Sequence, residues 1–475
     1  MDKQSTRWIL MLPMSLGAFA ASLDNNVLNV ALPAIIRDLE IDAGTGQFIV
    51  SSYTFAIVAL LLIFGALSIN FGRKRVFAIG TLIFSLSSLV AALAPNELIL
   101  VASRIIQGMG AAMFMANGMA LVSSNFEKNN WGKAFGILAT AGAIASIVGP
   151  LVGSAIASFW NWRFIFLLVV ILGLLASVTA NKLLEDHPAG DYKTALTRFD
   201  YKGSLLSIVA VIILVSSFSF LSSNSWFLFA LLLVLFFIIG KIFISHQLRT
   251  RNALLPVQAI KNKSFLQGNT MAMIVFALMM GIGIILPLHL DNAFTSTLIT
   301  AGFLITLQAI PIFAFSFVAG FLADKYSANN VAFGGCSAIF LGITLLATAL
   351  HFELTILMAI ASIIVGIGIG LFNPSNNKVV MSCVEIKYSS IAASVNVLFR
   401  NIGIALGTAL AGILYSFFQA SLIASVLSPG TAALLFYVGL SLILLIMGAI
   451  RIIHQKRYNA GSPSFSPTIN ANLKR

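Results

Sequence analysis

Apolar runs of about twenty residues alternate with short polar segments along nearly the whole chain. A helix of this length crosses the hydrocarbon core of a bilayer, and it satisfies its own backbone groups there. The runs lack a period of two, which excludes a β-barrel. We therefore predict an all-α polytopic membrane protein with fourteen spans. The predicted spans are 8–34, 46–69, 76–95, 97–123, 134–158, 162–181, 203–222, 226–245, 265–290, 299–323, 331–350, 354–373, 391–418 and 431–453.

Charge supports this pattern and sets the topology. Only 9% of the 475 residues are charged and 59% are hydrophobic, whereas soluble domains carry about 25% charged residues. The net charge of +13 would suggest nucleic acid in a soluble protein, but here it lies in the loops, so we expect no nucleic-acid partner. With both termini inside, 24 of the 28 Lys and Arg residues fall in inner loops and tails or at the inner ends of spans. The positive-inside rule then predicts that both termini are cytoplasmic.

An internal repeat divides the chain into two halves. The segment that begins at Gly65 ends the second span, and a similar segment that begins at Gly320 ends the tenth. Two pseudo-symmetric bundles around a central cavity are typical of transporters. We predict a six-span bundle (1–181), cytoplasmic loops with inserted spans seven and eight (182–264), a second six-span bundle (265–453) and a polar tail (454–475).

Asp24 is the first candidate for a functional residue, because it lies past the middle of the first span. An ionisable residue inside the membrane is costly, and such residues mark ion and substrate pathways. A carboxyl group in low dielectric can exchange protons near neutral pH. The structural alternative is an acid that bonds to Asn25, Asn29 or another span.

Other polar residues within the spans are weaker candidates. Arg104 keeps its charge in proteins, so it can hold a hydrogen-bond network beside an acid but cannot carry a proton. The alternative is a structural buried arginine whose donors bond carbonyl oxygens. Gln107 lies close to the same helix face. Asn29, Gln107, Asn117 and Arg400 are the residues that we assign to the substrate cavity.

Arg400 and Asp291 are candidates with alternatives that stay open. Arg400 begins about nine residues into its span, so its side chain could instead reach the nearer membrane surface. Asp291 follows Pro287 at the end of the ninth span and corresponds in the repeat to a position near Arg37. It suggests an acid at the outer mouth of a cavity, or a loop-end acid in water.

Glycine and proline in the fifth span suggest a hinge. Pro150 removes a helical hydrogen bond, while Gly149 and Gly153 permit close packing. The sequence contains no Walker loop, zinc spacing or nucleophile motif. We therefore expect no enzyme activity, no catalytic residues, no metal and no cofactor, with energy taken from an ion gradient.

These residues resemble the major facilitator superfamily, and within it the fourteen-span drug:proton antiporter family of bacterial multidrug exporters. The likeness runs from about Leu10 to Arg451. It rests on four motifs in order: Leu23-Asp24 to Pro33, Arg104-x-x-Gln107-Gly108, Gly142 to Gly153, and Arg400-Asn-x-Gly403-x3-Gly407. The resemblance implies proton coupling through Asp24 and Arg104, and a major facilitator fold with two inserted spans in a bacterial plasma membrane.

The loop after the second span departs from the superfamily pattern. Gly65, Gly72 and Arg73 are present, but Ile69 replaces the usual acid, which in relatives meets a helix end and locks the cytoplasmic gate. The second half keeps this acid as Asp324, so we predict that it forms the main latch. Asp291 stands where relatives often have glutamine, which suggests an added acidic site.

The predicted function is proton-driven efflux of amphiphilic drugs by alternating access, with Asp24 as first proton carrier and Asp291 as a weaker second. Expected partners are lipophilic drugs, protons and membrane lipid, and we expect a monomer. The first alternative is a proton-coupled or facilitated transporter of a specific metabolite, which would need a denser set of polar groups in the spans. The second is a receptor or scaffold, which gives no reason for an acid inside the bilayer.

Overall fold

The computed structural model describes residues 8–159, 161–185, 200–222, 225–250, 254, 261–293, 298–420 and 427–461. Within these residues the chain forms fourteen helices of twenty or more residues. They are α2 (Met11–Asp38), α3 (Ala43–Phe71), α4 (Arg73–Ala92), α5 (Glu97–Asn125), α6 (Trp131–Phe159), α7 (Arg163–Leu183), α9 (Tyr201–Ser222), α10 (Trp226–Arg249), α12 (Lys263–Ala293), α13 (Leu298–Lys325), α14 (Ala328–His351), α15 (Thr355–Ser382), α16 (Ser389–Ala420) and α17 (Pro429–Gly461). Two short 3-10 helices, η1 (Lys128–Asn130) and η2 (Ile386–Tyr388), precede α6 and α16.

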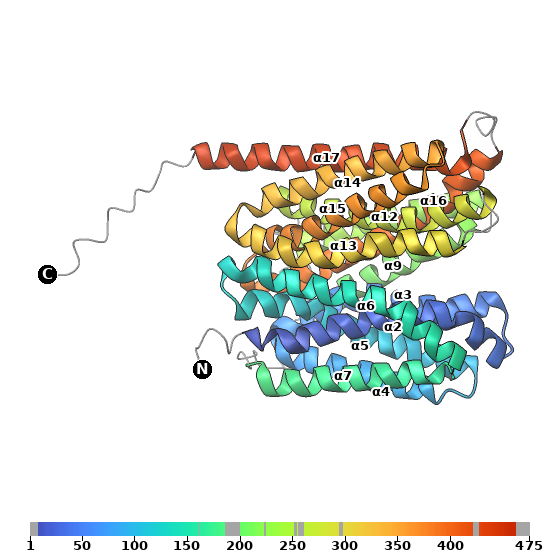
Figure 1. The fold of residues 1–475 in the computed structure, drawn as a ribbon. Coiled ribbons are helices and arrows are strands. Elements are labelled where there is room, and N and C mark those ends of the chain that lie inside the picture. Colours follow the sequence, from blue (N-terminus) through green and yellow to red (C-terminus); the bar gives the residue numbers. More distant parts are fainter. Residues whose placement is uncertain are drawn as a thin grey trace.

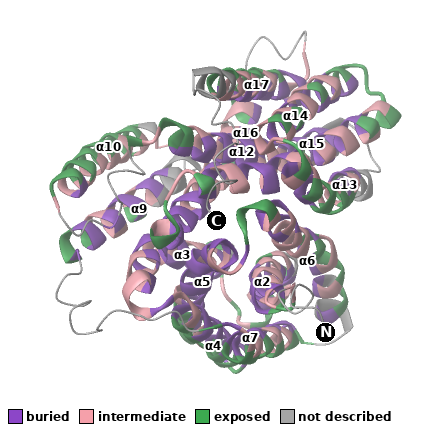
Figure 2. Cartoon of the chain, turned by 90° about the vertical axis from the view of Figure 1, so that its left-hand side faces the viewer, coloured by how far each residue is buried: buried purple, intermediate pink, exposed green. Residues whose placement is uncertain are grey.

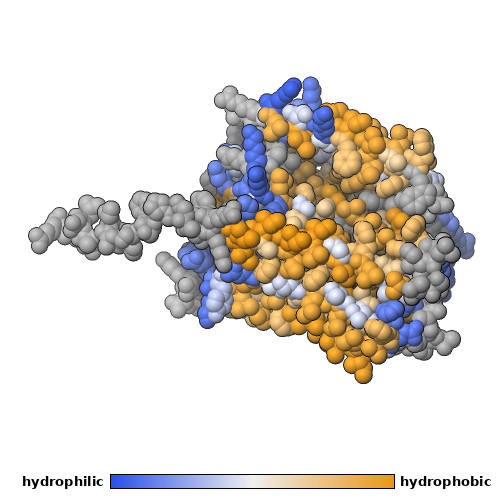
Figure 3. All heavy atoms as spheres, turned by 90° about the horizontal axis from the view of Figure 1, so that it is seen from above, coloured by the Kyte–Doolittle hydropathy of each residue, from blue (hydrophilic) through white to orange (hydrophobic). Residues whose placement is uncertain are grey.

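The helices run side by side as a bundle, and hydrophobic residues cover its sides between two polar ends (Figures 1 and 3). Twelve helices in the described parts are long and apolar enough to cross a membrane, so the protein is a multi-pass membrane protein. α2 is a thirteenth if its parts Met11–Leu28 and Ala31–Asp38 form one span, and α9 contributes a shorter apolar stretch, Tyr201–Leu214. The all-helical membrane fold is thus confirmed, and the count of fourteen spans stays a prediction.

Helix ends coincide with polar capping residues where the sequence supplies them. The Asp42 carboxylate accepts hydrogen bonds from the backbone N–H groups of Gly44 and Thr45 at the start of α3. The Thr45 hydroxyl and these N–H groups lower the pKa of Asp42. Asn96 accepts from the N–H of Ile99 and caps α5 in the same way. Such caps satisfy donors that a helix cannot pair internally.

α17 is longer than the predicted span and enters the segment predicted as a polar tail. It runs to Gly461, whereas the prediction ended at 453. The rest of the predicted tail lies outside the described residues, as does most of the loop 182–202.

Helices α2 to α7 pack on one another, and α12 to α17 do the same (Figure 2). Contacts between these two sets, the first and second halves below, involve mainly α6 with α13 and α16 with α3 and α5. α9 lies against α3 and α16, while α10 lies outermost and packs chiefly on α9 (Figure 2). The predicted domain boundaries stay a prediction.

The halves are joined at one end of the bundle, where α2 begins and α17 ends (Figure 1), which we call the termini end. One large buried cluster combines first-half residues with Val380, Met381 and Ile391 to Val397 of the second half. The other two clusters each belong to one half. Among the described residues, every side-chain hydrogen bond between the halves also lies at the termini end. The structure is therefore closed at that end.

The packing of α12 on α16 depends on two glycines. A methyl group at Gly403 would meet the backbone oxygen of Met273, and one at Gly407 would meet that of Ala277. The two helix backbones therefore approach closely, which is the role of small residues in membrane helix pairs.

We expect Gly407→Val to destabilise the protein by about 1–3 kcal/mol, the usual cost of overpacking. The measurement is thermal unfolding of the purified protein in detergent. Gly412→Ala in the same helix is the control, because nothing lies within 4 Å of a methyl group there. Equal unfolding temperatures for the two variants would contradict this account of the α12–α16 contact.

Candidate functional site

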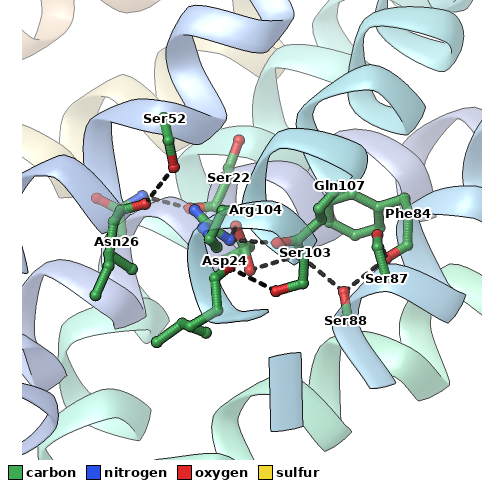
Figure 4. A network of polar contacts seen from close by, with 12 residues as sticks. Ser22, Asp24, Asn26, Ser52, Phe84, Ser87, Ser88, Ser103, Arg104 and Gln107 are labelled. Atoms are coloured by element: carbon green, nitrogen blue, oxygen red, sulfur yellow. Dashed lines mark hydrogen bonds and ion pairs between the residues drawn. The ribbon is translucent and has the colours of Figure 1, made fainter. Parts of the chain in front are cut away.

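The Asp24 carboxylate meets the Arg104 guanidinium in the interior of the first half (Figure 4). Arg104 Nη1 lies 2.7 Å from Asp24 Oδ2, and both side chains have 0% exposure. Asp24 lies midway along α2, and Arg104 lies in the second turn of α5. Removing two charges from water costs several kcal/mol per ion, so each depends on the other.

Gln107 completes the network on the same face of α5. Its Nε2 donates to Asp24 Oδ1 at 2.9 Å and to Ser88 Oγ at 2.7 Å. Its Oε1 accepts from Arg104 Nη1. The carboxylate thus accepts from two side chains, one charged and one neutral, and the network extends from α2 through α5 to α4 (Figure 4).

The Arg104 guanidinium has capacity for further bonds. Its Nε and Nη2 are buried and lack a hydrogen-bond partner among the described residues, as does the Tyr53 hydroxyl. The Tyr53 ring from α3 lies 4.3 Å from the guanidinium carbon. A cation over an aromatic face is stabilised by the ring's negative face. Tyr53 therefore holds Arg104 in place through its ring face, while two nitrogens of the guanidinium have no hydrogen-bond partner among the described residues.

We expect Tyr53→Leu to lower stability by about 1–2 kcal/mol through loss of the cation–π contact, since desolvated pairs of this kind contribute up to about 2 kcal/mol. Tyr53→Phe keeps the ring face and should unfold within a degree or two of the wild type. Thermal unfolding measures both variants. If Tyr53→Phe and Tyr53→Leu lower the unfolding temperature equally, the Tyr53 hydroxyl and not its ring supports Arg104.

Two short polar residues of α2 lie beside the close contact with α6. Asn26 Nδ2 donates to the backbone oxygen of Ser22 at 2.6 Å. A methyl group on Gly149 would meet Asn26 Cβ, and one on Gly153 would meet Val27. The glycines that sequence suggested as a hinge thus bring α6 against α2 within a turn of Asp24, and Pro150 lies between them in α6.

Asp324 lies at the termini end, where α13 of the second half meets the start of α6. Its Oδ1 accepts from the N–H of Gly132 at 2.7 Å, and its Oδ2 accepts from the N–H of Lys133 at 2.8 Å. Lys378 of α15 forms an ion pair with Asp324 Oδ1 at 2.7 Å. A carboxylate is favourable at a helix N-terminus, where backbone N–H groups are unpaired.

The first half makes a different contact with α16. Arg73 donates from Nε to Ser390 Oγ at 3.2 Å and from Nη2 to the backbone oxygens of Ile386 and Lys387. Gly72, which separates α3 from α4, has φ of 91°, a region that favours glycine. At the termini end, the first half therefore contacts the second through the Arg73 cation and backbone carbonyl oxygens. The second half contacts the first through the Asp324 carboxylate and backbone N–H groups.

The other predicted site residues do not join the Asp24 network. Arg400 is half-buried in α16 and lies 4.3 Å from the Phe276 ring of α12. Asn117 is buried near the termini end, where its Oδ1 accepts from Ser390 Oγ at 3.0 Å across the two halves. Asn29 and Asp291 fall within α2 and α12, but their side chains lie outside the described residues.

Sequence reasoning missed three residues that the structure brings into these contacts. Tyr53 carried one signal, a phenol inside an apolar span. Lys378 was counted only as loop charge, and nothing local links it to Asp324. Arg451, near the inner end of the last predicted span, was counted only with the inner positive charge, but it is buried, with 4% exposure, and donates to Asn376 Oδ1 at 2.8 Å.

The family is decided by comparison with known proteins. The family model described as Major Facilitator Superfamily matches residues 14–251 and 269–471. The chain belongs to the major facilitator superfamily. This family and the fold indicate a transporter rather than an enzyme.

Relatives of this superfamily chain differ in the substrates that their names give. It is 26% identical to the riboflavin transporter RibZ of Clostridioides difficile, over 88% of this chain and 89% of that protein. It is 25% identical to the methylenomycin A resistance protein of Bacillus subtilis, over 86% of this chain and 88% of the relative. It is 24% identical to multidrug resistance protein 3 of the same organism, over 86% of this chain and 80% of that protein.

Solved structures agree in fold. The human organic anion transporter MFSD10 superposes with a TM-score of 0.69 at 11% identity, over 94% of this chain and 100% of that one. The proton:xylose symporter XylE superposes with a TM-score of 0.63 at 14% identity, over 94% of this chain and 95% of that one. The predicted major facilitator fold is therefore confirmed, while substrate and coupling are not given by these similarities.

Proposed function

We propose that this transporter exports amphiphilic compounds in exchange for protons, as a member of the drug:proton antiporter family in a bacterial plasma membrane. The observation that carries the proposal is the fully buried Asp24–Arg104 pair inside a membrane-spanning bundle. Ionisable groups at such depth serve in proton relays and ion pathways. Relatives named for methylenomycin A and multidrug resistance support drugs as the substrate class.

Asp24 is the proton carrier in this mechanism, and Arg104 is its counter-charge. When Asp24 takes up a proton, its ion pair with Arg104 is lost, and Gln107, which is itself bonded to Ser88, remains to bond the neutral acid. Arg104 is then a buried cation without a counter-ion, which is unfavourable. Protonation of Asp24 thus makes this arrangement of the site less favourable, and that loss of stability can drive a conformational change. Asp291 remains a proposed second acid.

The termini end is the cytoplasmic end in this proposal, as the positive-inside pattern predicts. The structure, closed at that end, is then a state that does not open to the cytoplasm. Asp24 has no exposed surface in it, so proton exchange needs a rearrangement of the helices. Rocking of the two halves about a central site is the motion typical of such repeats.

The test is compound-driven proton movement in liposomes that contain the purified protein. A pH gradient is preset, and lipophilic cations, fluoroquinolones and riboflavin are added in turn. We expect several lipophilic drugs to collapse the gradient, with protein-free liposomes as the control. Antiport is contradicted if a compound crosses the membrane down its own concentration gradient but no compound moves protons. The protein would then be a facilitated carrier.

A second candidate is transport of a specific metabolite, which the similarity to a riboflavin transporter favours. In that case riboflavin or a related flat aromatic compound would be carried with saturable kinetics, and unrelated lipophilic drugs would neither be carried nor compete. Competition by chemically unrelated drugs would instead support the export proposal.

A further inference from the structure

The two halves bring equivalent positions to equivalent helices at the termini end. A methyl group on Gly65 would meet Ser390 and Ser394 of α16, and one on Gly320 would meet Gly132 and Lys133 of α6. α16 and α6 are each the fifth helix of their half, as α3 and α13 are each the second. Each glycine therefore lets one half lie against the other at a matching place.

Ile69 and Asp324 occupy the same place relative to these glycines, because each follows its glycine by four residues. Asp324 supplies a carboxylate that bonds two backbone N–H groups and Lys378. Ile69 supplies no charge and no acceptor. The first-half contact therefore lacks the anion that completes the second-half contact.

A cavity lies at the position of the missing acid. Ile69 forms part of its wall, and the charged residues in the lining are Arg73, Lys74, Lys387 and Glu185. Among the described lining residues, three cations against one carboxylate leave an excess of two positive charges. Among the described residues, none of the three cations forms an ion pair.

Arg73 is held in the wall of the cavity, and its Nη1 group has no hydrogen bond to a described residue. Its contacts with Ser390 and with the carbonyl oxygens of Ile386 and Lys387 use Nε and Nη2 and fix the guanidinium in the wall. The Nη1 group can still donate to an anion oxygen, and the guanidinium keeps its positive charge. Lysine ammonium groups add point charges that bind phosphate without a fixed geometry.

We propose that this cavity binds a phosphate-bearing anion, which supplies the negative charge that Ile69 does not. The cavity lies at a polar end of the bundle, next to the apolar sides that lipid tails cover (Figure 3). Basic pockets between membrane helices bind the head groups of acidic lipids. The phosphate can therefore come from an acidic phospholipid or from free phosphate, and the two sources are separated by experiment.

The experiment measures thermal unfolding of the full-length protein in lipid nanodiscs. Wild type is compared in phosphatidylcholine alone, in phosphatidylcholine with inorganic phosphate at constant ionic strength, and in phosphatidylcholine with phosphatidylglycerol. We expect the unfolding temperature to rise by about 2–4 °C or more when the anion is bound, the range for about 1 kcal/mol in mid-sized proteins. A rise with phosphatidylglycerol alone assigns a lipid head group, and a rise with both assigns the free anion as well.

Two sets of variants decide whether the rise belongs to this cavity. Ile69→Asp places a carboxylate in the cavity and should remove the response, while Ile69→Asn, which is uncharged and similar in size to Asp, should keep it. Lys74→Gln and Lys387→Gln, which remove charge from partly or fully exposed side chains, should each reduce the response. Lys128→Gln, an exposed lysine outside the lining, is the matched control.

The proposal is overturned if neither anion raises the unfolding temperature of the wild type. It is also overturned if Ile69→Asp and Lys387→Gln respond as fully as Lys128→Gln, because the anions then act on general surface charge. These measurements read stability and not transport, so they hold whichever compounds the protein carries.

Discussion

Asp24→Asn is expected to abolish compound-driven proton movement, at least tenfold below wild type, while leaving exchange of labelled substrate across the membrane in place. Asparagine keeps the size and one acceptor of the side chain but cannot carry a proton. Compound-driven collapse of a preset pH gradient measures the first effect, and exchange of substrate at equal pH measures the second. Asp42→Asn, an exposed acid at the start of α3, is the matched control.

This variant also leaves Arg104 buried without its counter-ion, so stability has to be separated from coupling. Removing one partner of a buried ion pair costs about 3–5 kcal/mol, and thermal unfolding would show it. Asp24→Asn combined with Arg104→Gln removes both charges and should recover most of that loss. The double variant should remain uncoupled. If it regained proton movement, Asp24 would be a structural acid and another group would carry the proton.

Asp324→Asn is expected to weaken the closed arrangement at the termini end. The change removes the ion pair with Lys378 and the negative charge at the start of α6. Hydrogen bonds to charged groups contribute about 1.5–3 kcal/mol each, so the closed population should fall at least tenfold relative to the open one. Spin labels at exposed Lys128 and Lys325, on the two sides of this contact, report the change as a longer distance.

Lys378→Gln gives the graded comparison for this latch. It removes the ion pair but leaves both backbone N–H groups on the Asp324 carboxylate, so its shift in distance should be smaller than that of Asp324→Asn. A wild-type distance distribution in Asp324→Asn would contradict the latch. The closed end would then depend on the buried cluster that both halves share there.

The sequence predicted the fold because membrane helices carry a strong signal. Long apolar runs and loop charge gave every long helix to within several residues, and the repeat at Gly65 and Gly320 gave the two halves. The exceptions were the C-terminal ends of α15, which runs to Ser382 where 373 was predicted, and of α17. α17 continues to Gly461, past the apolar run, and hydropathy reports the end of an apolar run and not the end of a helix.

The site was predictable residue by residue but not as a set of contacts. Asp24, Arg104 and Gln107 were each identified as polar groups inside spans, and the structure brings them together. Arg400 and Asn117 were assigned to the same cavity on equal grounds, but they lie against Phe276 and Ser390. Depth within a span follows from sequence, whereas the neighbour that a side chain faces depends on helix rotation and packing. Lys378 and Arg451 were missed for the same reason.

The inserted pair α9 and α10 has a consequence for any motion of the two halves. Asp200 at the start of α9 bonds to His246 and Gln247 of α10, which ties the two helices into one unit. α9 contacts α3 of the first half and α16 of the second, so this unit lies across the seam between them. When α3 and α16 change their separation, α9 can follow only one of them and must slide along the other. The inserted helices would therefore act as a sliding seal, which keeps lipid tails out of the seam while the halves move.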